Sequence, residues 1–243
     1  VFYAVVPPML QAVGGQALFW MFSVVMAIAF VAVLLFYRSP ARLEEQAGGA
    51  APFSRAVWLA IGGVCLMTFN QAMVFSFVEV IGEARGFAKD QVMIVLVVLG
   101  FVNFLVAAPA AVFLEKRLPA FKVVQAGVVV QGVFAVIVTS ATVFPLWAAI
   151  ASVYVAVQIF THAFAFGLIG QLEKTGRALA ATPAMLMSGA ALGPIIGGAL
   201  GQSFGFAALG VAAVIVAAAA LACYRLASIG AGAEDLQNQG ASA

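Results

Sequence analysis

Charged residues are scarce in this sequence. Lys, Arg, Asp and Glu make up 8% of its 243 residues, whereas they make up about a quarter of an ordinary soluble domain. Hydrophobic residues make up 65%, and they form runs of about twenty, long enough to cross a hydrocarbon core as helices. The runs lack the apolar/polar alternation of an outer-membrane barrel. We therefore expect an all-α membrane protein, a polytopic bundle of transmembrane helices.

Cysteine and histidine are also rare. Cys65 and Cys223 stand within or at the end of apolar runs with no CxxC or His/Cys spacing, so we expect free thiols and no metal site. The sequence has no GxSxG, HExxH, phosphate-loop or paired-carboxylate pattern, so we expect neither an enzyme, nor an ATP-driven pump, nor a bound cofactor. The net charge of +2 is too small to indicate nucleic-acid binding.

Apolar runs and one polar linker divide the chain. The sequence opens on Val-Phe-Tyr inside an apolar run, so we expect residues 1–13 to end a span that starts upstream. A complete span at 17–37 and a polar linker at 38–55 follow. Six apolar segments come after the linker, at about 56–79, 89–114, 121–141, 145–170, 178–202 and 205–226. A polar tail follows from residue 229.

The basic residues indicate the orientation, because cytoplasmic loops retain an excess of Lys and Arg. With the linker in the cytoplasm, nine of the eleven basic residues fall on that side, and only Arg85 and Lys89 fall on the other. The nine are Arg38, Arg42, Arg55, Lys116, Arg117, Lys122, Lys174, Arg177 and Arg225. We therefore expect a cytoplasmic C-terminus. Aromatic side chains near span ends, as expected at membrane interfaces, are Trp20, Tyr37, Trp58, Trp147 and Tyr224.

This arrangement, with a cytoplasmic linker, six spans after it and one and a half before it, resembles the major facilitator superfamily. The resemblance implies that residues 1–37 are the partial fifth and the complete sixth helix of a first half, that 38–55 is the central linker and that 56–228 is a six-helix second half. It implies a plasma-membrane secondary transporter that moves a small molecule by alternating access. In that transporter this chain works with the missing part of the first half. Two alternatives remain open: a non-transporting assembly or sensing protein, and six spans that form a first half.

Two local motifs contribute to the resemblance. FLEKRLPAFKV (113–123), with Glu115, Lys116, Arg117 and Lys122, resembles the superfamily's loop motif, although an ordinary basic turn is an equal alternative. GAALGPIIGG (189–198) is similar to the GxxxGPxxGG pattern of proton-coupled antiporters in this family. We expect a packing or gating helix, with packing alone as the alternative, formed by Gly189, Gly193, Gly197 and Gly201 on one face, Gly198 beside them and Pro194 allowing a bend.

Polar side chains within spans are the candidates for substrate contact, because they are costly in lipid. The candidates are Asn70, Gln71, Ser76, Asn103, Gln125, Gln131, Gln158, Thr161, His162, Thr182 and Ser188. In the superfamily the first and fourth helices of each half line the cavity, which favours Asn70, Gln71, Gln158 and His162 over Gln125 and Gln131. We expect substrate binding at these four favoured residues and at Asn103 and Ser188. Interhelical hydrogen bonds that only help packing are the alternative.

Proton coupling is an open alternative within this interpretation. His162 is the only histidine and shares a helix face with Tyr154 and Gln158, so it is either a proton relay or a buried histidine bonded to Gln158 or a backbone carbonyl. Glu79 and Glu83 are expected to be interfacial carboxylates near Arg85 and Lys89 rather than proton carriers. The residues suit sugars, amphipathic drugs and organic acids alike.

Overall fold

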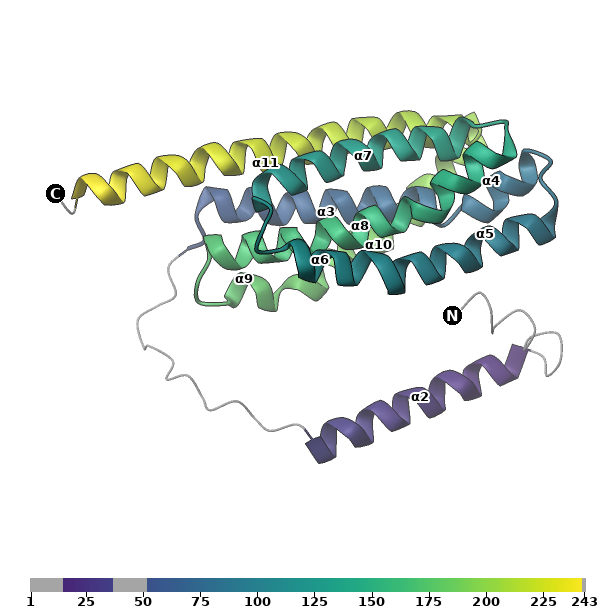
Figure 1. Ribbon diagram of the computed structural model, residues 1–243, viewed down its shortest axis with the longest axis horizontal. Helices are drawn as coiled ribbons and strands as arrows, with labels where there is room; N and C mark the ends of the chain where they lie inside the picture. The colour runs from purple at the N-terminus through teal and green to yellow at the C-terminus, as the bar shows by residue number, and fades with distance from the viewer. Residues whose placement is uncertain (1–14, 37–51, 242–243) are drawn as a thin grey trace. The chain divides into compact units, whose positions relative to one another are not determined.

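The computed structural model describes residues 15–36 and 52–241, and these are almost entirely helical, with no strand among them. The chain divides into two compact units, residues 1–52 and 53–243. The predictions for residues 1–13 and for Arg38 and Arg42 of the linker lie outside the described residues. For the described part, the predicted all-α class is confirmed (Figure 1).

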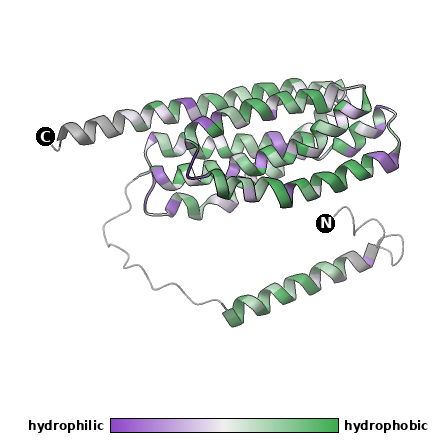
Figure 2. Cartoon of the chain, in the orientation of Figure 1, coloured by the Kyte–Doolittle hydropathy of each residue, from purple (hydrophilic) through white to green (hydrophobic). Residues whose placement is uncertain are grey.

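Seven helices in the described part are long and apolar enough to cross a membrane. The first unit supplies one of them, α2 (Gly15–Phe36), whose apolar side chains from Phe19 to Phe36 are largely exposed within its own unit. Such a helix is stable only where lipid or other helices cover it. A multi-pass membrane protein is therefore the class that the helices support (Figure 2).

The second unit contains six spans that run side by side (Figure 1). Their elements are α3 (Arg55–Phe75) with α4 (Val78–Ala84), α5 (Lys89–Val102) with η1 (Asn103–Ala107) and α6 (Ala108–Leu114), α7 (Ala120–Ser140), α8 (Phe144–Leu172), α9 (Arg177–Ala180) with α10 (Thr182–Phe204), and α11 (Ala207–Ala241). The predicted spans agree with these helices within a few residues at most ends. Beyond the predicted end at 226, α11 stays helical through the polar segment to Ala241.

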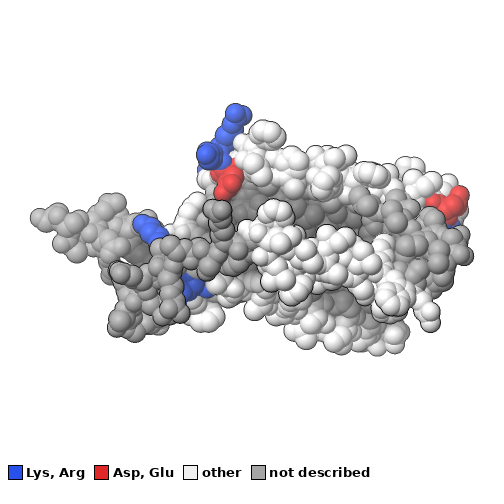
Figure 3. Space-filling model, turned by 90° about the horizontal axis from the view of Figure 1, so that it is seen from below, with Lys and Arg blue, Asp and Glu red and all other residues white. Residues whose placement is uncertain are grey.

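Charged side chains of the second unit gather at the two ends of the bundle, with uncharged surface between them on the face that Figure 3 shows. The end at which α3 begins and α6, α8 and α11 finish is the basic one. Its described basic residues, all exposed, are Arg55, Lys116, Arg117, Lys122, Lys174, Arg177 and Arg225. At the opposite end, Glu83 forms an ion pair with Lys89 at 3.7 Å, and Arg85 donates to the Thr139 carbonyl at the C-terminal end of α7 at 2.5 Å.

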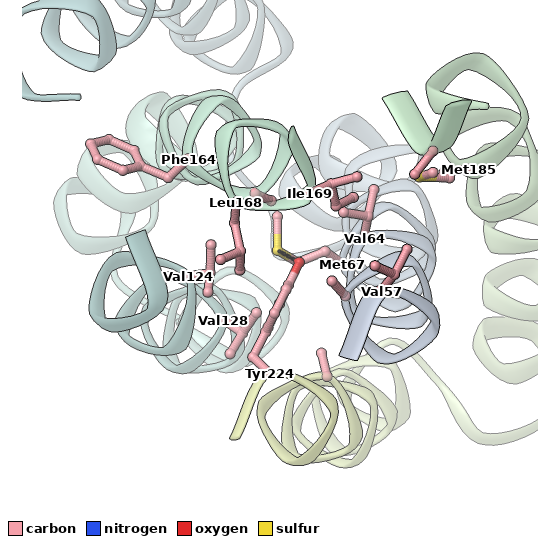
Figure 4. Close-up of a cluster of buried hydrophobic side chains, with 14 residues drawn as sticks. Val57, Val64, Met67, Val124, Val128, Phe164, Leu168, Ile169, Met185 and Tyr224 are labelled. Atoms are coloured by element: carbon pink, nitrogen blue, oxygen red, sulfur yellow. Dashed lines mark hydrogen bonds between the residues drawn. The ribbon is translucent and has the colours of Figure 1, made fainter. Parts of the chain in front are cut away.

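The core of the bundle is built around α3, which packs against α8, α10 and α11. Figure 4 shows Tyr224 of α11 reaching across the core toward Met67, with Val124 and Val128 of α7 and Leu168 of α8 around it. The Tyr224 hydroxyl donates to the Met67 sulfur at 3.4 Å. Tyr224 and Trp147 were expected at the membrane interface, and both are 0% exposed. Both rings face into the bundle, because a neighbouring glycine makes room for each: Gly63 for Tyr224 and Gly82 for Trp147.

Three of the predicted spans are interrupted. Ser76 and Phe77 separate α3 from α4, and Ala181 separates α9 from α10. In the second span of the unit, residues 103–107 widen into a π-helical turn shortly before Pro109. Proline has no N–H for the carbonyl four residues earlier, and its ring clashes with that carbonyl in a regular helix. A wider turn at this point relieves that clash.

Candidate functional site

The contact between α3 and α10 is made by glycine against backbone. A Cβ placed on Gly189 would lie 2.5 Å from the Phe69 backbone nitrogen, and one on Gly193 would lie 2.7 Å from that of Met73. At Gly197 the nearest atom is the Met73 carbonyl oxygen, at 2.6 Å. These three glycines are buried and let the two helices approach more closely than any side chain would allow.

The other members of the glycine motif have different surroundings. A Cβ on Gly198 would make only an ordinary contact with the Phe77 ring at 3.5 Å, and one on Gly201 would meet Phe206 at 3.3 Å. Pro194 lies inside α10 and is half-buried, between the buried Gly193 and the exposed Ile195. The closely packed face therefore consists of three glycines, with Gly201 and Gly198 outside the direct contact with the α3 backbone.

The contact between α3 and α8 is made by polar side chains. The Thr68 hydroxyl oxygen lies 3.0 Å from Nε2 of His162, and Nε2 of Gln158 lies 3.3 Å from the same ring nitrogen. The His162 ring stacks on Phe166 with centroids 5.5 Å apart. Thr68, Gln158 and His162 are all buried, and Gln158 stands midway along α8. The predicted link between His162 and Gln158 is present, and Thr68 joins it from the other helix.

Asn70 faces a different neighbour. Its side chain is 0% exposed, and its Nδ2 donates to the Ala213 carbonyl of α11 at 3.0 Å. The amide oxygen of Asn70 is buried and has no hydrogen-bond partner in the structure. The structure therefore does not bring Asn70 together with Gln158 and His162, and its contacts are those of a packing residue between α3 and α11.

Gln131 turns inward, although the third helix of a half was expected to lie outside. It is 1% exposed, and its Nε2 donates to the Met67 carbonyl of α3 at 3.2 Å. Tyr154 of α8 reaches the same part of α3, where its hydroxyl donates to the Asn70 carbonyl at 3.5 Å. These bonds tie α7 and α8 to the middle of α3. Gln125, by contrast, is half-buried.

The remaining predicted substrate residues lie closer to the surface of the unit. Ser188 is exposed, and its hydroxyl donates to Cys65 at 3.5 Å and to the Met185 carbonyl at 2.9 Å. Gln71 is half-buried. Asn103 begins the π-helical turn, and its amide oxygen is buried and unpartnered in the structure. Ser188 thus contacts α3, the helix that carries Thr68 of the polar cluster, from the α10 side. Asn103 belongs to the second span of the unit.

Charged residues of the loop motif lie at the basic end. Glu115, Lys116 and Arg117 follow α6 and are exposed. The Glu115 carboxylate comes 3.7 Å from the position a Cβ would take on Gly167 of α8. The motif therefore lies beside α8 at this end.

At the same end, Glu173 caps the short helix α9. Its carboxylate accepts hydrogen bonds from the Thr175 N–H at 2.9 Å, from the Thr175 hydroxyl and from the Ala178 N–H at 3.0 Å. These bonds, first of all that from the Thr175 hydroxyl, lower the pKa of Glu173 to about 2. Two N–H groups of the turn and of α9 are thereby satisfied.

Thr68 is the residue that the sequence did not bring forward. A threonine in a helix often bonds to the carbonyl four residues earlier, and Thr68 does so with Val64 at 3.0 Å, so it looks self-satisfied in the sequence. Only the packing of α8 on α3 brings its oxygen to His162. A count of which hydroxyls lie at the depth of His162 is the one signal that would have included it.

Outside the polar cluster, the described part has an apolar groove but no candidate metal site. No group of three or more His, Cys, Asp or Glu side chains there could hold a metal ion. A groove of about 370 Å³ lies between α7 and α11, and only apolar residues line it, among them Val133, Val136, Val214 and Leu221. This groove is suited to hydrocarbon and is separate from the polar cluster.

Comparisons with known proteins assign no family: no protein-family model matches the chain, and no curated protein matches it.

Proposed function

We propose that the chain is part of a secondary transporter of the major facilitator type, with residues 56–228 as its second six-helix half. It moves a small molecule across the plasma membrane by alternating access, and its C-terminus is cytoplasmic. The observation that carries the proposal is the polar cluster of Thr68, Gln158 and His162 in the middle of two spans. Polar groups at that depth are costly and mark substrate or ion pathways.

The arrangement around the cluster supports the same proposal. Secondary transporters bind near the bilayer midplane, between two helical repeats. The six spans of this unit begin and end on the basic side, as a half with both termini in the cytoplasm requires. The close glycine contact between α3 and α10 lets these two helices act as one body beside α8. Ser188, Gln71 and the cluster supply neutral hydrogen-bonding groups, which suit sugars, amphipathic drugs and organic acids.

Thiol labelling tests whether an aqueous path reaches this part of the protein. In the full-length protein with Cys65 and Cys223 replaced by Ala, we expect Ser188→Cys to react with a membrane-impermeant thiol reagent. Asn70→Cys is the matched control, because its side chain is enclosed against α11, and we expect it to stay unreacted. Absence of labelling at Ser188→Cys from both sides of the membrane would contradict an aqueous path there.

Uptake measurements test transport itself. Proteoliposomes holding the full-length protein are given panels of sugars, amphipathic cations and organic acids, with and without a pH gradient. We expect accumulation of at least one class, and we expect His162→Phe to reduce it.

Labelling of Asn70→Cys together with no labelling of Ser188→Cys would place the water-accessible face on the opposite side of α3 and would overturn the proposed site.

A further inference from the structure

His162 has two hydrogen-bonding neighbours on one ring nitrogen. Nε2 lies 3.0 Å from the Thr68 hydroxyl and 3.3 Å from Nε2 of Gln158. An amide NH2 only donates, so the Gln158 contact requires a lone pair on the His162 nitrogen. With the Gln158 nitrogen toward the ring, Nε2 is unprotonated, the neutral imidazole carries its proton on Nδ1, and the Thr68 hydroxyl points at Nε2 instead of at the Val64 carbonyl.

Thr68 can serve the opposite state as well. Its hydroxyl oxygen is 3.0 Å from the Val64 carbonyl and 3.0 Å from His162, so the single hydroxyl proton has two alternative acceptors. When the proton points to Val64, the oxygen of Thr68 is free to accept a bond from a protonated Nε2. Gln158 can turn its amide so that the oxygen, instead of the nitrogen, faces the ring. Both protonation states of His162 can thus be satisfied without moving a helix.

We propose that His162 is a proton-binding site, with Nε2 as the atom that takes up the proton and Thr68 as the residue that positions it. A hydronium ion gives up one proton and becomes water; the proton forms a bond to the Nε2 lone pair, and the ring gains one positive charge. The Thr68 hydroxyl turns to Val64 and the Gln158 amide inverts, so both then accept from Nε2–H instead of donating to Nε2. The place of this step in a transport cycle rests on the proposed function, whereas the tautomer is a property of the chain itself.

The surroundings of His162 determine what else responds to pH there. The elements packed against α8 are α3, α5, η1, α6, α7 and α9. The charged or titratable groups on α8, on these elements or at their ends are Arg55, Cys65, Lys89, Asp90, Glu115, Lys122, Tyr154, Glu173 and Arg177. Most stand at helix ends, and Cys65 hydrogen-bonds with Ser188 while Tyr154 bonds to the Asn70 carbonyl. In the described part, the side-chain hydrogen-bond partners of His162 are the neutral Thr68 and Gln158.

The sequence offers a direct test, because His162 is its only histidine. With ¹⁵N-histidine incorporated into the full-length protein in lipid bilayers, solid-state NMR reads the two ring nitrogens of a single residue. At pH 7.5 we expect Nδ1 to be protonated and Nε2 unprotonated. On acidification from pH 8 to 3, the Nε2 resonance should move to the protonated position. A predominant Nε2–H tautomer at pH 7.5, or no protonation over this range, would overturn the proposal.

Two variants test the role of Thr68. Thr68→Val keeps the shape and removes the hydroxyl, so we expect the tautomer ratio to shift toward Nε2–H, and Thr68→Ser should restore the wild-type spectrum. The matched control is Thr161→Val, since the Thr161 hydroxyl donates to Val157 of its own helix. Identical spectra for Thr68→Val and the wild type would refute the positioning role. If Thr68→Val does not fold, the wild-type tautomer and Thr68→Ser still decide.

The outcome separates this inference from the proposed function. The NMR measurement requires no substrate and no transport. A proton at Nε2 in a protein that moves nothing across the tested panels would leave the proton site standing and count against the transporter. Uptake with an Nε2–H tautomer at all pH values would do the reverse.

Discussion

The same helix, α3, meets two neighbours in opposite ways. Toward α10 it presents backbone and receives glycine, with no polar side chain needed at Gly189, Gly193 and Gly197. Toward α8 it presents the Thr68 hydroxyl to a histidine and a glutamine. The α3–α10 contact depends on the absence of side-chain atoms on the glycines, and the two backbones fit together in one way. The second depends on hydrogen bonds that can be made in more than one way, so a change between protein states is most easily accommodated there.

The largest expected effect lies on the glycine side. Gly189→Ala places a methyl group 2.5 Å from the backbone of Phe69, where neither helix can yield without moving. We expect a loss of about 1–3 kcal/mol in the free energy of unfolding, as for overpacked cores. The loss can be measured by denaturant titration in micelles. Gly198→Ala is the matched control in the same helix, because its methyl group would meet only Phe77 at 3.5 Å. Equal destabilisation by the two variants would remove the distinction between close and open glycines.

A smaller effect is expected where α3 meets α11 through Asn70. Asn70→Ala removes the donor to the Ala213 carbonyl and leaves a small cavity. Interhelical hydrogen bonds in membranes contribute about 0.6 kcal/mol on average and about 1.7 at most, so we expect a loss of about 1 kcal/mol. The loss should be the same at pH 5.5 and 7.5. Gln71→Ala, at the half-buried next position, should cost less; a larger loss there would show that burial of Asn70 was not the cause.

The polar contact with α8 should show a still smaller mean effect but a dependence on pH. Thr68→Val removes one hydrogen bond between the helices, and we expect a loss of about 0.6 kcal/mol in the free energy of unfolding. Because the hydroxyl serves both states of His162 differently, this loss should differ between pH 3.5 and 7.5. Unfolding titrations at both pH values check it. A loss that is constant with pH would make the contact as fixed as the one with α10.

The smallest effect concerns the Glu173 carboxylate, which caps α9. Its folded pKa of about 2 lies below the ordinary value of 4.5, so its contribution is fully present above pH 4.5 and is lost as the pH falls toward 2. Glu173→Gln should therefore flatten the stability profile between pH 4.5 and 2 and leave the profile between pH 5.5 and 7.5 unchanged. Thermal unfolding at closely spaced pH values measures this. A change near neutrality would mean that Glu173 affects stability through something other than its own ionisation.

Much of the fold follows from the sequence, because span length and the scarcity of charge are local properties. The six spans of the second unit and the positions of the packing glycines belong to this class. The direction of a polar side chain does not, since it depends on how far one helix is rotated against the next. Asn70 and Gln158 have the same kind of side chain in the middle of a span, yet one binds to α11 and the other to His162. Thr68 escaped notice for the same reason.

The π-helical turn at residues 103–107 has a consequence for the phase of its span. One wide turn adds a residue without adding a full step of rotation, so α6 presents its side chains about 100° away from where α5 alone would have placed them. The side chains of α5 and of α6 are thus directed at their neighbours independently. A deletion of one residue in this turn would hardly shorten the span, but it would rotate α6 relative to α5 and turn its side chains toward different neighbours.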